Sequence, residues 1–228
     1  MGTIYLIRHG QASFAASDYD DLSEPGREQG RVLGKALLSR GVDPQIVICG
    51  GMRRHAQTAT ECLTAQAREP VWELDRGWDE YDHNDMLAGL DPRYREQTAV
   101  AADMQGQADP RRAFQLIFER AMSRWVSGDG AYRESWPAFC GRVEDSLERL
   151  AARVGKAQTA LVFTSGGAIS VVLRKLLGLE DTRTLVLSAT LANASVTKLI
   201  VGGRGITLST MNEHAHFEGA HKHLITYR

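Results

Sequence analysis

The chain opens with a short apolar run that ends in an arginine, a histidine and a glycine. Residues 4–7 (Ile-Tyr-Leu-Ile) have the β-branched and aromatic character of a buried strand, and Arg8, His9 and Gly10 follow directly. In open α/β sheets, ligands bind beyond the carboxyl ends of the strands, where a glycine lets the backbone turn or approach a ligand closely. This strand therefore brings a fixed cation and a nitrogen nucleophile to one place, which suits a phosphoryl group.

Strand-like and helix-like patterns alternate in the sequence on either side of a central segment. Apolar runs predict strands at residues 45–49, 71–74 and 159–164, and a β-hairpin formed by residues 195–201 and 205–209. Helical patterns lie between them, at residues 25–40, 53–67, 138–154 and 168–177. This alternation predicts an α/β fold: a three-layer α/β/α sandwich around a mostly parallel central sheet.

The segment at about residues 82–136 has a different character. Met, Gln, Arg and Asp are scattered through its helical stretches, and Pro92, Pro110 and Pro137 punctuate them. We expect this segment to be a helical cap insertion over one end of the sheet. The whole chain, residues 1–228, is then a single domain that carries this insertion.

Composition excludes several classes of function. The formal net charge of −1 gives no electrostatic case for binding nucleic acid or a membrane surface, so a phosphate site needs a local cluster of cations. No apolar stretch is long enough to span a bilayer, and no signal-peptide pattern is present. The three cysteines lack metal-ligand spacing, and Cys49 ends an apolar run, which favours buried thiols in a reducing cytoplasm.

Three of the predicted strands end in similar turns. Besides residues 8–10, residues 50–54 (Gly-Gly-Met-Arg-Arg) and 164–167 (Thr-Ser-Gly-Gly) each lead from a strand into a helix. Helix N-termini present free N–H groups and the positive end of the helix dipole, which favour anions. One such turn is explained by the fold alone. Three turns that carry Arg8, His9, Ser165 and one of Arg53 and Arg54 favour a shared anion site.

These residues resemble the motifs of the histidine phosphatase superfamily, which includes the cofactor-dependent phosphoglycerate mutases. Arg8-His9-Gly10 is similar to its signature, and residues 22–29 to its Leu-Thr-x-x-Gly-x-x-Gln segment. Residues 52–59 resemble its Arg-Ala-x-Gln-Thr-Ala helix start, which assigns the second core arginine to Arg54. Residues 78–81 fall where the family has its acidic proton donor, which points to Glu80, and residues 191–197 match an Asn-x-Ser-x-Thr pattern. The resemblance extends from residue 3 to about residue 217, apart from the cap.

The sequence departs from the family at one core position. A Ser-His-Gly-Gly turn is usual after the late strand, whereas this chain has Ser165 where the second histidine is expected. The resemblance implies that Ser165 and Gly166 contact the phosphoryl group. A serine supplies only a neutral hydrogen bond, which is about half as strong as a charge-assisted one. We expect a slower or differently tuned enzyme, with a catalytically weak phosphate-binding or regulatory module as the alternative.

The resemblance also implies a mechanism. Neutral His9 attacks phosphorus and becomes a phosphohistidine, Arg8 and Arg54 neutralise the phosphoryl oxygens, and Glu80 protonates the leaving alkoxide. No cofactor and no metal are expected. The histidines of residues 214–223 offer a zinc site as a less favoured interpretation. Whether His214 or His216 replaces the missing imidazole is left open by the sequence.

The sequence favours hydrolysis of a small phosphorylated substrate. Residues 11–14 (Gln-Ala-Ser-Phe) lack the Trp-Asn pair that is common in the phosphoglycerate mutases. This difference favours a phosphomonoesterase over a mutase or phosphotransferase, which remains the second hypothesis. The sequence names neither the physiological substrate nor the oligomeric state.

Overall fold

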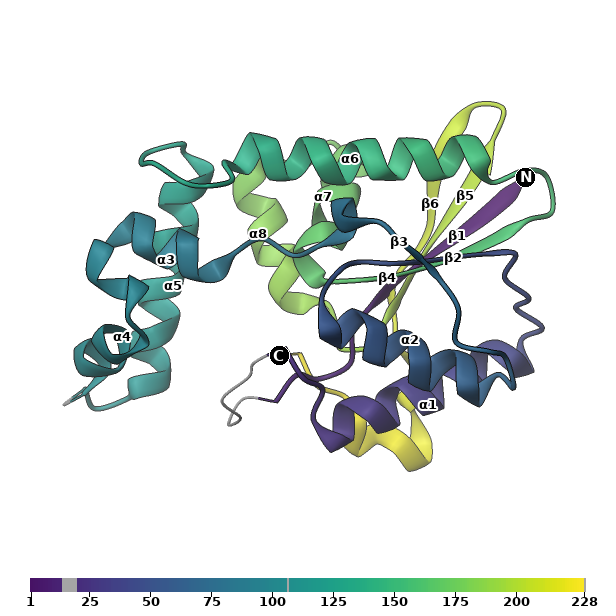
Figure 1. The fold of residues 1–228 in the computed structure, drawn as a ribbon, viewed down its shortest axis with the longest axis horizontal. Coiled ribbons are helices and arrows are strands. Elements are labelled where there is room, and N and C mark those ends of the chain that lie inside the picture. The colour runs from purple at the N-terminus through teal and green to yellow at the C-terminus, as the bar shows by residue number, and fades with distance from the viewer. Residues whose placement is uncertain (14–19, 106, 228) are drawn as a thin grey trace. The chain divides into compact units, whose positions relative to one another are not determined.

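A computed structural model describes residues 1–13, 20–105 and 107–227. Its sheet has the strand order β3-β2-β4-β1-β5-β6 (Figure 1). Strands β3, β2, β4 and β1 are parallel to one another, whereas β5 runs antiparallel to β1 and β6 antiparallel to β5. The strand bounds are Gly2–Arg8 for β1, Ile46–Cys49 for β2, Glu73–Leu74 for β3, Thr159–Thr164 for β4, Val196–Gly202 for β5 and Gly205–Glu213 for β6. The predicted mostly parallel sheet and its terminal hairpin are confirmed.

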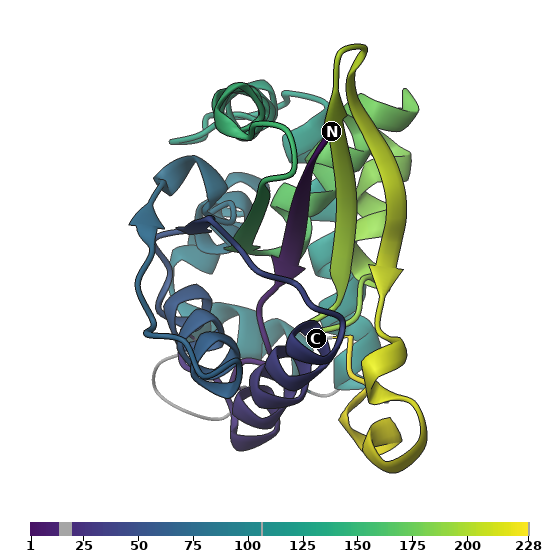
Figure 2. The same ribbon diagram turned by 90° about the vertical axis from the view of Figure 1, so that its right-hand side faces the viewer.

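Helices cover both faces of this sheet (Figure 2). Helices α1 and α2 pack against each other on one face, and α7 lies on the other face with the C-terminal part of α6. Helix α8, which packs on α7, is an element that the sequence patterns did not predict. The helix bounds are Glu24–Ser39 for α1, Arg53–Ala65 for α2, Trp136–Arg153 for α6, Gly166–Leu177 for α7 and Asp181–Thr190 for α8. The three-layer α/β/α architecture is therefore confirmed.

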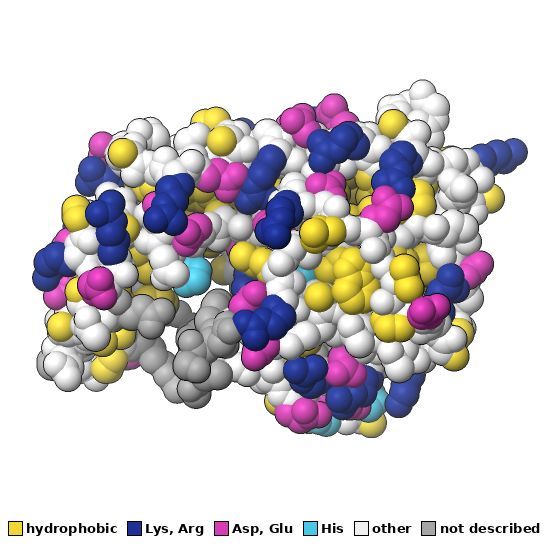
Figure 3. All heavy atoms as spheres, viewed as in Figure 1, with side chains coloured by type: hydrophobic (Ala, Val, Ile, Leu, Met, Phe, Trp, Pro, Cys, Tyr) yellow, Lys and Arg dark blue, Asp and Glu magenta, His cyan; other side chains and the backbone are white. Residues whose placement is uncertain are grey.

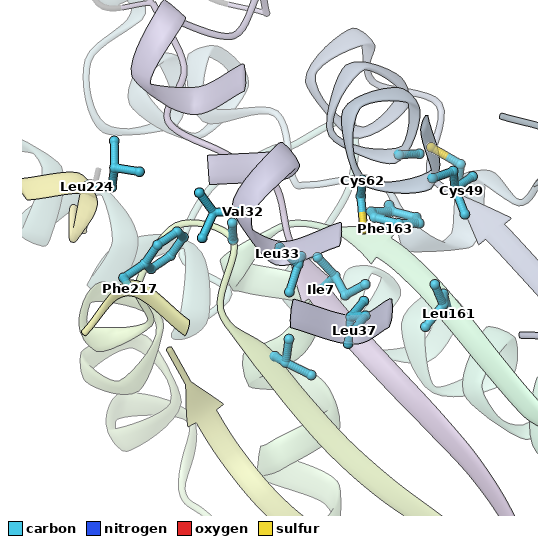
Figure 4. Packing of buried hydrophobic residues seen from close by; sticks show 14 residues of the cluster. Ile7, Val32, Leu33, Leu37, Cys49, Cys62, Leu161, Phe163, Phe217 and Leu224 are labelled. Carbon is cyan, nitrogen blue, oxygen red and sulfur yellow. The ribbon is translucent and has the colours of Figure 1, made fainter. Parts of the chain in front are cut away.

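The core between the sheet and helices α1 and α2 packs around the ends of β1 and β4. Ile7, one residue before the Arg-His-Gly motif, is fully buried there with Phe163 from the end of β4 (Figure 4). Leu33 of α1 and Cys62 of α2 close the cluster from the helix side. Each buried apolar side chain contributes about 1.5–3 kcal/mol. The ends of β1 and β4 are thus fixed by tightly packed neighbours.

The C-terminal segment joins the same core. Residues 214–223 do not form the extended chain that a zinc site with paired histidines requires. They form two short 3-10 helices, η3 (Ala215–Phe217) and η4 (Gly219–Leu224), because Phe217 and Leu224 turn inward to the core of Figure 4.

Residues Tyr81–Gly141 form a second compact unit, apart from the unit of Met1–Glu80 and Arg142–Arg228. It contains α3 (His83–Leu90), η2 (Pro92–Arg95), α4 (Gln97–Met104), α5 (Pro110–Val126) and the first residues of α6. Its centre is an aromatic cluster with ring centroids 5.0–5.9 Å apart, made of Tyr81, Trp125, Trp136 and Phe139. The segment is helical, as the sequence indicates, and its role as a cap on a single domain stays a prediction.

The distribution of surface charge and the burial of the thiols are as the composition indicates. Basic and acidic side chains are interspersed over the face shown in Figure 3. Cys49, Cys62 and Cys140 are buried and free, and burial raises the pKa of the Cys49 and Cys62 thiols to about 12. Among the helices that the structure describes, none has the length and apolar character to cross a membrane.

Candidate active site

The backbone of His9 is held from both sides at the end of β1. Its N–H donates to the carbonyl of Thr164 at 2.9 Å, which ties it to the end of β4. Its carbonyl accepts from the N–H of Ala194 at 3.2 Å and from the side-chain amide of Asn193 at 3.3 Å. The next position requires a glycine, Gly10, because a Cβ there would collide with the backbone of Gly26 in α1. Sheet and loop geometry together fix where His9 points.

The imidazole of His9 is arranged as a neutral nucleophile. Its Nδ1 lies 2.7 Å from the carbonyl oxygen of Gly10, so Nδ1–H donates there and the lone pair stays on Nε2. The side chain is almost fully buried. Burial, followed by the charges of Arg54 and Arg8, holds the pKa of His9 well below its ordinary value of 6.5. At neutral pH the ring is therefore uncharged, as attack on phosphorus requires.

Helix α2 begins with two adjacent arginines, and their burial distinguishes them. Arg54 is only 7% exposed, whereas its neighbour Arg53 has an exposed side chain and pairs with Asp21 at 3.4 Å. The Thr58 hydroxyl donates to the Arg54 carbonyl at 2.7 Å and accepts from the N–H of Gly10 at 3.0 Å. This hydroxyl therefore docks α2 against the loop that follows His9. The charges that act on the His9 ring are those of Arg54 and Arg8, whereas Arg53 is not among them.

The carboxylate of Asp20 is bound to Arg54. Asp20 accepts from Nη1 of Arg54 at 2.9 Å and from the backbone N–H of Arg53, at the first turn of α2, at 2.8 Å. A guanidinium and a helix N-terminus are the donors that bind an anion. The side chain of Asp20 thus occupies donors suited to a phosphoryl group.

Arg8 is fixed by backbone carbonyls from the C-terminal half of the chain. Its guanidinium donates to the carbonyl of Leu191 and, at 3.3 Å, to that of Tyr227. The buried side chain of Gln29 holds this region together, since its amide accepts from Gln11 N–H at 2.7 Å and donates to the carbonyl of Leu224 at 2.7 Å. These contacts explain physically why a glutamine ends the motif at residues 22–29.

Glu80, the predicted proton donor, is bound to the first turn of α7, which follows β4. Glu80 Oε2 accepts from the N–H of Gly167, in the first turn of α7, at 2.9 Å. The Thr164 hydroxyl donates to the Trp78 carbonyl at 2.6 Å, and Arg142 donates to the Asp79 carbonyl at 2.8 Å. The chain that carries Glu80 is therefore bound from two directions. Asp79 serves another purpose, since its carboxylate accepts from the N–H of Gly51.

His55 is a site residue that the sequence analysis missed. Its ring is fully buried, its Nε2 lies 2.6 Å from the Ser165 hydroxyl, and its centroid is 5.8 Å from that of His9. The available signal was the second position of the residue 54–59 motif, where the family has alanine and this chain has histidine.

The C-terminal histidines make other contacts. The ring of His216 packs at a tilt against that of Phe217, with centroids 4.1 Å apart, and burial lowers the pKa of His216 to about 4. His214 Nδ1 lies 2.6 Å from the carbonyl of Asn212. None of the contacts described for these two rings reaches Arg8, His9 or Arg54. Within the described residues, no group of three or more His, Cys, Asp or Glu side chains is arranged to hold a metal ion.

The chain belongs to the histidine phosphatase superfamily (branch 1), whose family model matches residues 4–214. This match confirms the family that the sequence motifs indicate. No curated protein sequence matches the chain at a significant level.

Solved structures with the same fold include several phosphatases. A phosphoserine phosphatase variant from Entamoeba histolytica, crystallised with phosphoserine, superposes with a TM-score of 0.64 at 16% identity over 95% of this chain and 99% of that one. A mycobacterial glucosyl-3-phosphoglycerate phosphatase with inorganic phosphate gives 0.65 at 22% identity, over 95% and 99%. A phosphoglycerate mutase from Bacillus anthracis gives 0.61 at 18% identity, over 94% of each chain. At these identities the similarity establishes the fold.

Proposed function

We propose that the protein is a metal-independent phosphomonoester hydrolase that acts through a phosphohistidine on His9. The observation that carries this proposal is the state of the His9 ring: neutral, with Nδ1–H bound to Gly10 and the lone pair left on Nε2, beside the two cations Arg8 and Arg54. Most of the help in phosphoryl transfer is electrostatic and positional, so two fixed guanidinium groups supply the charge that a metal would otherwise bring.

The reaction then has two steps. In the first, the Nε2 lone pair forms a bond to phosphorus, the ester P–O bond breaks, and the leaving oxygen takes a proton from the Glu80 carboxyl group. In the second, the Glu80 carboxylate takes a proton from water, the water oxygen bonds to phosphorus, and the P–N bond breaks to free His9 and inorganic phosphate. Ser165 and Gly166 are proposed to complete the phosphate site.

The two positive charges beside His9 favour a phosphorylated substrate. We expect a small phosphorylated metabolite, and the neighbours crystallised with phosphoserine and with inorganic phosphate support this class. A phosphotransferase that passes the phosphoryl group to another hydroxyl is the second candidate, favoured by the fold similarity to a phosphoglycerate mutase. The lack of the Trp-Asn pair at residues 11–14 favours hydrolysis, although Phe14 lies outside the described residues.

The test is a screen of phosphorylated metabolites against the purified protein, with His9→Ala as the control and phosphate release as the readout. Hydrolysis should require His9 and survive EDTA. Brief incubation with a ³²P-labelled substrate should leave label on His9 that is labile to acid and stable to alkali. Label that survives acid contradicts the phosphohistidine, and activity restored only by added zinc or magnesium contradicts the metal-independent mechanism. Transfer to a second hydroxyl without phosphate release supports the phosphotransferase, and phosphate binding without turnover supports a binding module.

A further inference from the structure

We propose that His55 is a positioning residue of this site, and that His55 and Ser165 together take the place of one histidine at position 165. The proposal rests on the proposed function, because it concerns the same site. His55 comes from helix α2 and Ser165 from the turn between β4 and α7, 110 residues apart in the sequence, yet their hydrogen bond is 2.6 Å long. Both residues are 0% exposed.

This hydrogen bond joins the two halves of the site. His55 directly follows Arg54, so its ring leaves the same turn of α2 as the guanidinium beside His9. Ser165 lies two residues before Gly167, whose N–H holds the Glu80 carboxylate. A contact between His55 and Ser165 therefore couples the phosphate-binding arginine to the segment that holds the proposed proton donor. Loss of this contact should move Glu80 relative to His9.

The surroundings of His55 leave it no other described side-chain hydrogen-bond partner. Its Nδ1 is buried against the backbone of Gly50 without a hydrogen bond of normal geometry. A Cβ on Gly50 would collide with this nitrogen, so the glycine after β2 provides the space that the imidazole fills. A buried hydroxyl without a partner destabilises the fold, so the hydrogen bond between Ser165 and Nε2 of His55 satisfies a group that would otherwise be unpaired.

Positions 55 and 165 have to be considered as a pair. The resemblance in sequence places alanine at 55 and histidine at 165 in the family, whereas this chain has histidine at 55 and serine at 165. With Nε2 of His55 2.6 Å from Oγ of Ser165, a second imidazole at 165 has no room. The buried space between positions 55 and 165 holds one imidazole ring, which either position can supply. In this chain position 55, on α2, supplies it.

The ring acts as a neutral group. Burial, followed by the charge of Arg54, lowers the pKa of His55 well below 6.5. His55 therefore neither donates a proton to the leaving group nor carries charge to the phosphoryl oxygens. Its role is to hold Ser165 in place and to share the buried volume next to His9.

A swap of the two residues tests the proposal. We compare wild type, His55→Ala, Ser165→His and the double variant His55→Ala/Ser165→His, by turnover of the best substrate and by calorimetric binding of inorganic phosphate. His55→Ala should lower kcat by about two- to tenfold, the value of one net hydrogen bond. Ser165→His should lose more, because the pocket is overfilled. The double variant should recover to within about threefold of wild type, since it holds one ring again. A double variant no better than the worse single variant overturns the proposal.

A second cycle keeps the test decisive if Ser165→His fails to fold. In a Ser165→Ala background, His55→Ala should have little further effect on kcat or phosphate affinity, because the link is already broken. Fully additive losses overturn the positioning role. His216→Ala is the matched control: it removes another, partly buried imidazole of lowered pKa and should leave kcat within about twofold of wild type.

The two readouts separate this proposal from the proposed function. If wild type shows no turnover but phosphate affinity follows the swap pattern, the hydrolase assignment fails and the pair of His55 and Ser165 stands. If wild type turns over and His55→Ala matches it in both readouts, the pair fails and the hydrolase stands. A wild type that neither turns over nor binds phosphate overturns both.

Discussion

The two sides of the candidate site differ in the charge of their side chains. On the side of β1 and α2, Arg8 and Arg54 place two fixed positive charges beside a neutral His9. On the side of the β4–α7 turn, the groups are the neutral hydroxyl of Ser165, which bonds to His55 of α2, and the carboxyl group of Glu80 on a helix N–H. If the proposed roles hold, phosphate affinity depends mainly on the two arginines and proton transfer on Glu80, so each side should respond to different substitutions.

The charged side should show the largest effect. Arg54→Ala leaves phosphate charge uncompensated in a nearly buried site, and we expect kcat/KM to fall about a hundred- to a thousandfold. Steady-state kinetics on one substrate checks this. Arg53→Ala is the matched control, since its side chain is exposed and pairs with Asp21, and it should change kcat/KM by less than about threefold. Equal losses in the two variants would remove the distinction between adjacent arginines.

On the opposite side, Glu80→Gln removes the proposed proton donor but keeps its shape. For alkyl phosphates, whose leaving groups need a proton, kcat should fall about a hundredfold. For p-nitrophenyl phosphate, which leaves without help, kcat should change little. The control is Asp82→Asn, because Asp82 caps α3 in the other unit. A uniform loss across both kinds of ester would mean that Glu80 binds phosphate or maintains structure.

The same comparison shows what the sequence could predict. A strand that ends in arginine and histidine can be recognised in a sequence, because each of these residue types indicates its chemistry without reference to a partner. The pair of His55 and Ser165 is not visible in this way. The serine looks like a loss and the histidine like a surface helical residue until folding places Nε2 next to Oγ. Motif comparison at each position separately misses a substitution that is compensated at another position.

Prediction of the fold from local sequence patterns has a similar limit. The ends of β1, β2 and β4 were predictable within a residue or two, because buried parallel strands are continuous apolar runs. Helix α8 was missed, since residues 181–190 place four polar residues before a run of three apolar ones, without a clear helical face. Its packing on α7 supplies what the local pattern lacks.

The low pKa values on both sides predict how pH acts. His9 and His55 stay neutral in the folded protein well below pH 6.5, whereas both bind a proton near pH 6.5 when unfolded. The activity should therefore keep its nucleophile through pH 6. The stability that these two histidines contribute is fully present above pH 6.5 and is lost as pH falls below it, because the unfolded state binds more protons. Thermal unfolding at pH 7.5 and 5.0 should show a smaller loss of Tm in His55→Ala than in wild type. An equal loss would mean that His55 titrates normally.

The smallest effect is expected where a carboxylate competes with the ligand on the charged side. Asp20 bonds to Arg54 Nη1 and to the first turn of α2, so a phosphoryl group that uses these donors has to displace it. Asp20→Asn removes the competing charge, and a partly exposed ion pair of this kind is worth at most about 1 kcal/mol, so phosphate affinity should rise about two- to fivefold. Isothermal titration calorimetry with inorganic phosphate measures this change. Asp21→Asn, whose partners are Arg53 and Gln57, is the control and should leave the affinity unchanged. Weaker phosphate binding in Asp20→Asn would show that Asp20 instead orients Arg54, so that the charged side depends on an acidic neighbour for its geometry.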